Sequence, residues 1–153
     1  MIIKDKNKLQ EKCSPVSVKE GEEIGVRLLH ELRESENGIG LAANQIGINK
    51  RVCVVNVKEP LVLINPKIVE KSKEQFVFAE GCLSFPDSKI KTTRYQDIIV
   101  EADNHKGQLS FSANSKDIKT LLLRLITTKV NYLSQQIVKT SRMHLNVFVF
   151  NTK

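Results

Sequence analysis

The sequence has no long apolar run and few cysteines, and both absences restrict where the protein can work. No apolar stretch approaches the roughly 20 residues of a membrane-spanning helix, and the first residues lack the apolar core of a signal peptide. The cysteines Cys13, Cys53 and Cys82 are odd in number, widely spaced and without a CxxC pair, which argues against a disulfide framework. We therefore predict a cytoplasmic protein that has no membrane partner.

Acidic residues are absent from the last part of the chain. Leu123–Lys153 contains five basic residues and no acidic one, whereas the residues before it are almost balanced in charge. The net charge of +7 is therefore largely a property of this tail. A basic nucleic-acid-binding domain, which would bind with a steep salt dependence, is one interpretation. Because the basic residues are scattered rather than clustered, we do not expect specific nucleic-acid binding.

What the chain does contain is the composition of one globular domain. Its 153 residues are 41% hydrophobic and 27% charged, enough to bury a core without disulfides or metals. A single domain over residues 1–153 is therefore expected. Ser17 and Glu20 have the spacing of a capping box, and apolar residues recur at helical intervals from Ile24 to Leu32. These features predict a helix over Val18–Ser35.

Short runs rich in β-branched residues predict strands in the middle of the chain. They lie at residues 51–57, 61–65, 67–69, 75–80, 89–93, 97–103 and 108–112. We expect 67–69 and 75–80 to form a pair, and Asn104–Gly107 to form a hairpin turn that exposes His105. Cys53, inside the first run, is expected in the core. The fold class is α+β, with mostly antiparallel strands and a helical C-terminal segment.

Two stretches stand out from this background. Glu80–Ser84 reads Glu-Gly-Cys-Leu-Ser and follows an apolar run, so the thiol of Cys82 is expected on a turn, as a metal ligand or a nucleophile. A small buried hydrophobic residue is the alternative for such a cysteine. Gly38–Gln45 reads Gly-Ile-Gly-Leu-Ala-Ala-Asn-Gln, which alone could be a close-packed loop. Together, in this order and separation, the pair resembles the first two signature motifs of the peptide deformylases.

The resemblance implies an activity and its partners. Peptide deformylases remove the formyl group from the N-terminal formylmethionine of new proteins, so it implies N-formylmethionyl peptides and nascent chains as substrates, with the ribosome as a further partner. It also implies a peptide-deformylase-like fold over residues 1–122, followed by a divergent tail over 123–153. The implied cofactor is Fe(II), or Zn, Ni or Co in its place.

The resemblance also implies the roles of individual residues. Cys82 would be a metal ligand, and the Gln45 side chain and the backbone N–H of Leu83 would bind the oxyanion. The remaining residues would bind substrate: the backbones of Ile39, Gly40 and Gly81 would hold the peptide in an extended form, and Phe78 would help line the methionine pocket.

The third motif of that family is missing. It reads His-Glu-x-x-His on a late helix, where the i, i+4 spacing places both imidazoles beside the metal. Here the late segment Thr120–Leu133 has neither histidine nor glutamate, and His144 has no histidine four residues away. A chain with one thiolate ligand is predicted to bind catalytic metal poorly and to be nearly inactive.

The loss of a single base is one hypothesis for this absence. The codons CAT GAG ATT GAT CAC encode His-Glu-Ile-Asp-His, and without the first A they read CTG AGA TTG ATC AC, which encodes Leu-Arg-Leu-Ile-Thr. Those are the residues of Leu123–Thr127. In the same shifted frame, the codons of Lys129–Leu133 can contain the Gly, Leu and Phe of the family's continuation. A frameshift is one hypothesis, ordinary divergence is another, and an inactive deformylase-like protein that binds N-terminal peptides is the functional alternative.

Overall fold

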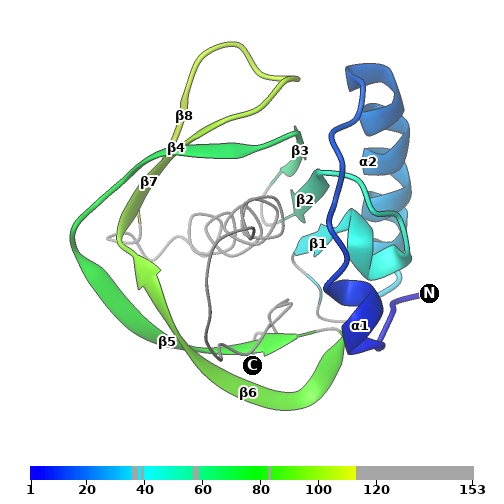
Figure 1. The fold of residues 1–153 in the computed structure, drawn as a ribbon, viewed down its shortest axis with the longest axis horizontal. Coiled ribbons are helices and arrows are strands. Elements are labelled where there is room, and N and C mark those ends of the chain that lie inside the picture. The colour runs from blue at the N-terminus through cyan, green and yellow to red at the C-terminus, as the bar shows by residue number, and fades with distance from the viewer. Residues whose placement is uncertain (36–37, 39, 57–58, 83, 113–153) are drawn as a thin grey trace.

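The computed structural model describes residues 1–35, 38, 40–56, 59–82 and 84–112 (Figure 1). Within these residues, two α-helices, one 3-10 turn and eight strands follow one another. They are α1 (Lys6–Leu9), α2 (Val18–Arg33), β1 (Gly40–Ala42), η1 (Ala43–Ile46), β2 (Val52–Asn56), β3 (Pro60–Ile64), β4 (Lys67–Lys71), β5 (Gln75–Cys82), β6 (Phe85–Tyr95), β7 (Asp97–Glu101) and β8 (Leu109–Ser112). This arrangement confirms the α+β class, and the predicted C-terminal helical segment lies outside the described residues.

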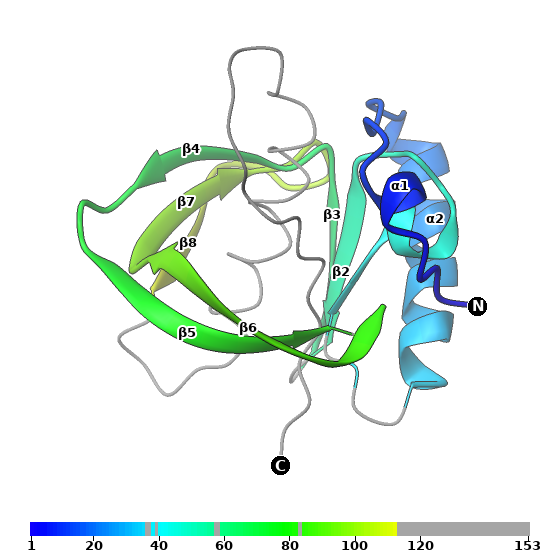
Figure 2. The same ribbon diagram turned by 60° about the horizontal axis from the view of Figure 1, so that its bottom comes forward.

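Helix α2 forms where the sequence predicts it and ends two residues earlier. Its first turn is capped by Ser17, whose side-chain oxygen accepts a hydrogen bond from the backbone N–H of Glu20 at 3.3 Å. The apolar face buries Ile24, Leu28 and Leu32 against the sheet, and Figures 1 and 2 both show α2 alongside β2 and β3. The helix approaches β3 closely, since a Cβ atom added at Gly25 would lie 2.6 Å from Cγ1 of Val62.

The strands form three antiparallel sheets, with the orders β1-β2-β3, β4-β7-β8 and β5-β6. The predicted pairing of 67–69 with 75–80 is wrong, because β4 pairs with β7 and β5 pairs with β6. Only two residues separate β5 from β6, so a hairpin between these two strands closes a short loop at a small cost in chain entropy. Strand β6 also begins earlier than the predicted 89–93, because Pro86 is tolerated near a strand's first residue.

The turn between β7 and β8 folds back onto β3. Gly107 has φ +79°, a conformation that glycine adopts readily, as expected for a hairpin turn. Asn104 accepts a hydrogen bond from the backbone N–H of Ile64 at 3.0 Å and donates one to the carbonyl of Val62 at 2.9 Å. His105 is therefore half-buried, with Nε2 2.9 Å from the same Val62 carbonyl, and the prediction that it is exposed is wrong.

Asn65 joins three segments where β3 ends. Its backbone is left-handed, with φ +49°, a conformation that asparagine tolerates better than most residues. Its side chain accepts a hydrogen bond from the backbone N–H of Val16 at 3.0 Å and donates to the Val16 carbonyl at 2.7 Å and to Asp103 at 2.6 Å. Asn65 thus ties the residues before α2 to the ends of β3 and β7.

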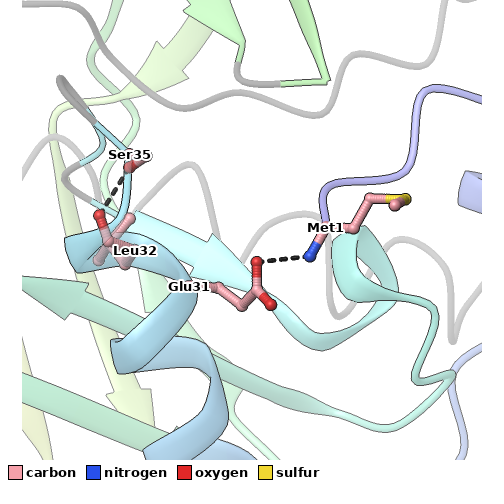
Figure 3. A network of polar contacts seen from close by, with 4 residues as sticks. All are labelled: Met1, Glu31, Leu32 and Ser35. Atoms are coloured by element: carbon pink, nitrogen blue, oxygen red, sulfur yellow. Dashed lines mark hydrogen bonds and ion pairs between the residues drawn. The ribbon is translucent and has the colours of Figure 1, made fainter.

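The first residues of the chain also contact α2 (Figure 3). The amino nitrogen of Met1 lies 2.6 Å from Oε2 of Glu31, and this hydrogen bond lowers the pKa of the Glu31 carboxyl. The Ser35 hydroxyl donates to the carbonyl of Leu32 at 2.6 Å, just after the helix ends. Within the described part of the chain, no helix is long and apolar enough to cross a membrane.

Candidate functional site

The first motif folds into a short strand followed by a tight turn. Strand β1 pairs with β2 in the register Gly40 with Val55, Leu41 with Val54 and Ala42 with Cys53. The chain then enters η1, which carries Asn44 and Gln45. It leaves this turn at Gly47, where φ is +82°. The motif is therefore attached to the helix-backed sheet through β1, and its glutamine lies on the turn beyond that strand.

The N-terminal segment fixes the backbone of this turn. The backbone N–H of Ile3 donates to the carbonyl of Gln45 at 2.7 Å. The side-chain amide of Asn44 donates to the carbonyl of Leu9 at 3.2 Å. Asn44 is buried, so these bonds satisfy polar groups that would be costly to leave unpaired.

The side chain of Gln45 is held at both ends of its carboxamide. Its Oε1 accepts a hydrogen bond from the backbone N–H of Ala42 at 3.0 Å, and its Nε2 donates to the hydroxyl oxygen of Ser84 at 3.5 Å. Gln45 is 2% exposed and Ser84 is 1% exposed. The structure therefore brings the two sequence motifs together through a buried pair of polar side chains.

The second motif lies at the end of the β5–β6 hairpin. The ladder runs from the pair Gln75 with Tyr95 to the pair Cys82 with Phe85, and its register shifts between Glu80 and Cys82. Such irregularities change the direction in which neighbouring side chains point and are frequent beside active sites. Figures 1 and 2 show the hairpin extending from the region of β4 and β7 toward β1.

The structure describes most of the predicted site residues, and two of them lie outside the described residues. The structure places Gln45 in η1 and Gly40 in β1, and it places the backbones of Phe78, Gly81 and Cys82 in β5. Ile39 and Leu83 lie outside the described residues. Ser84 has no role predicted from the sequence, although its place as the last residue of the Glu80–Ser84 motif was the available signal.

The other two cysteines are buried thiols. Cys53 is fully buried in β2, as predicted, and burial raises its pKa. Burial also raises the pKa of Cys13 to about 11, an effect that the neighbouring Arg51 guanidinium partly opposes. Because metal ligation and nucleophilic attack require the thiolate, neither cysteine suits those roles near neutral pH.

The described residues do not bring together a complete metal site. Over the described ranges, no group of three or more His, Cys, Asp or Glu side chains could hold a metal ion. Cys82 is the one metal ligand predicted from the sequence, which has no two histidines at a spacing of four residues. This donor set does not fit a catalytic metal, which needs three protein ligands and one open position.

The chain is similar to known proteins over most of its length. Residues 1–132 match the family described as polypeptide deformylase. A peptide deformylase of Heliobacterium modesticaldum is 43% identical over 114 residues, covering 72% of this chain and 73% of that protein. One from Hamiltonella defensa is 36% identical over 124 residues, covering 77% and 71%. The structure of a probable peptide deformylase from Synechococcus phage S-SSM7 superposes with a TM-score of 0.72 at 30% identity, covering 85% of this chain and 93% of that one.

Proposed function

This chain belongs to the peptide deformylase family, and we propose that its site is built to act on the N-formyl group of formylmethionyl peptides but lacks the ligands of a catalytic metal. The proposed substrates are N-formylmethionyl peptides and nascent chains, met in the cytoplasm beside the ribosome. The contact between Gln45 and Ser84 carries the proposal, because it joins the two motifs that the family shares.

Hydrolysis of a formamide requires hydrogen-bond donors aimed at the oxygen that becomes negative in the transition state. The Gln45 carboxamide can supply one. Its oxygen is already occupied by the Ala42 N–H, so the amide presents its nitrogen, and therefore its N–H groups, toward the second motif. A donor held in this way needs no reorganisation when charge develops. Gln45 is therefore the proposed oxyanion donor, with the Leu83 N–H as its partner.

The peptide itself is proposed to bind along β1. In the described part of the chain, β1 is an outer strand of its sheet and pairs with β2 on one side. An extended peptide can add to such an edge through main-chain hydrogen bonds. Gly40, in β1, and Gly81, in β5, are proposed to contribute backbone groups to it, together with Ile39. Phe78 is proposed to line the pocket for the methionine side chain.

The missing ligands are the reason for expecting little activity. Cys82 is the one proposed ligand that remains, and each lost histidine removes both binding energy and geometry. We propose that Fe(II), Zn, Ni or Co is retained poorly for this reason. The frameshift hypothesis explains why a chain that keeps two motifs has lost the whole of the third.

The deciding experiment starts from the nucleotide sequence across the codons of Leu122–Leu133. If one added base restores His-Glu-Ile-Asp-His in an open frame, the restored chain and the chain as written are purified and compared for metal content and hydrolysis of an N-formylmethionyl peptide. The restored chain is expected to hold stoichiometric metal and to be at least about 100-fold faster. Equal metal content and full turnover in the chain as written would overturn the proposal. Peptide binding without hydrolysis in both chains would favour the inactive binding protein.

A further inference from the structure

The buried contact between the two motifs involves a residue that has no assigned part in the reaction. The hydroxyl oxygen of Ser84 lies 3.5 Å from Nε2 of Gln45, and the two residues are 39 positions apart in the chain. Both side chains are almost fully buried. A buried hydroxyl is costly unless it has a hydrogen-bond partner, whereas an alanine of similar size needs none.

A carboxamide has one acceptor oxygen and two N–H groups on its nitrogen. In Gln45 the oxygen is committed to the Ala42 N–H, and one N–H is committed to Ser84. The second N–H has no partner among the described residues. The terminal torsion of a glutamine side chain is broad, so one hydrogen bond alone leaves the plane of the amide poorly fixed. Ser84 supplies the second point that fixes this plane.

We propose that Ser84 is a positioning residue: it holds the carboxamide of Gln45 so that the free N–H points at the formyl oxygen of a bound peptide. This inference rests on the proposed function. Ser84 acts through Gln45 and does not itself contact the reacting atoms. Removing the Ser84 hydroxyl lowers the affinity for the formylated peptide and leaves the affinity for the unformylated peptide unchanged.

The test compares the affinity of the full chain for an N-formylmethionyl peptide and for the same peptide without the formyl group, by titration calorimetry. Ser84→Ala is expected to weaken binding of the formylated peptide by about tenfold, the size of one hydrogen bond, and to leave binding of the unformylated peptide unchanged. Ser84→Thr, which keeps the hydroxyl, is expected to retain the preference. The matched control is Ser110→Ala, since Ser110 is exposed on β8.

A double-mutant cycle separates positioning from packing. In the background of Gln45→Ala, the effect of Ser84→Ala on formyl recognition is expected to vanish, because no carboxamide remains to be positioned. An equal loss of affinity for both peptides, or a loss that persists without Gln45, would show that Ser84 merely supports the fold and would overturn the proposal. If Ser84→Ala does not fold, Ser84→Cys, with a weak acceptor of similar shape, takes its place.

A second readout distinguishes failure of this inference from failure of the proposed function. Hydrogen exchange of the Gln45 side-chain N–H groups, followed by NMR, is expected to be slow in the unmodified chain and faster in Ser84→Ala. Unchanged exchange overturns the positioning role whatever the peptides do. If the unmodified chain does not distinguish the two peptides while Ser84→Ala accelerates exchange, the proposed function fails, and the claim that Ser84 serves the formyl oxygen fails with it.

Discussion

The two motifs of the site are anchored in the molecule by different means. The first belongs to the helix-backed sheet, where Leu41 and Ala43 share a buried cluster with Leu28 and Val54. The second lies at the end of the two-stranded β5–β6 sheet, which is held by its backbone ladder. The difference teaches that hydrophobic burial positions the backbone that carries Gln45, whereas the second motif is positioned by the hairpin register and by the contact of its Ser84 with Gln45.

The largest expected effect comes from truncating a buried side chain of α2. Leu28→Ala is expected to lower the free energy of unfolding by about 2–5 kcal/mol, because Leu28 is fully buried and the truncation leaves a cavity. This free energy is measured by urea unfolding, with circular dichroism as the signal. Val77→Ala on β5, where the side chain is 67% exposed, is the control and is expected to change stability by less than about 0.5 kcal/mol. Similar losses in both variants would contradict the comparison.

A smaller loss is expected at the junction between the sheets. Asn65→Ala removes three side-chain hydrogen bonds and places alanine at φ +49°, so about 1–3 kcal/mol of stability should be lost. Asn65→Gly tolerates the same φ but cannot restore the bonds. Thermal unfolding of both variants therefore separates the two causes: a glycine variant as stable as the parent would show that the hydrogen bonds contribute little.

The close approach of α2 to β3 predicts an overpacking effect. Gly25→Ala would bring a methyl group within 2.6 Å of the Val62 side chain, and valine is stiff. The expected net loss is about 1–2 kcal/mol, since alanine's better helix propensity offsets part of the strain. Adding Val62→Ala should relieve it, as a double-mutant cycle in urea would measure. Val26→Ala, at a site on the same helix that is 68% exposed, is the matched control, and an additive cycle would contradict the close contact.

The smallest effect concerns pH. Burial raises the pKa of Cys13 from its ordinary value of 9.0 to about 11. The unfolded chain therefore releases this proton at lower pH than the folded chain does, and stability present below about pH 9 is lost as the pH rises toward 11. Unfolding curves at a series of pH values between these limits should show a shallower decline for Cys13→Ala. Parallel declines in the two proteins would assign the effect to other groups.

Local signals in the sequence predicted the long helix and most of the strands, but not α1, β1 or η1. The capping box at Ser17 and the period from Ile24 to Leu32 predicted α2 to within two residues, because both signals act over a few neighbouring positions. Strand pairing was predicted less well, because which strands pair depends on where distant segments meet. The four-residue α1 is too short to show a helical period, and its cap at Asp5 was the signal that could have found it.

In the candidate site, too, local features were predicted from the sequence and contacts between distant residues were not. The two motifs are visible in the sequence because their residue types and order are specific. The contact of Gln45 with Ser84 is not visible, since it exists only after η1 and the β5–β6 hairpin have come together. The half-burial of His105 was missed for the same reason, because the Val62 carbonyl that it contacts is 43 residues away.

The polar contacts between distant segments also affect how the chain folds. They join residues far apart in sequence: 35 positions separate Asn44 from Leu9, 39 separate Gln45 from Ser84, and 49 separate Asn65 from Val16. Closing such loops costs chain entropy before the contact can offset it, which slows folding. During synthesis, η1 is made before Ser84, so the carboxamide of Gln45 gains its second anchor only when the hairpin docks. The site is thus completed late in folding, and a chain interrupted before that point carries the first motif without its partner.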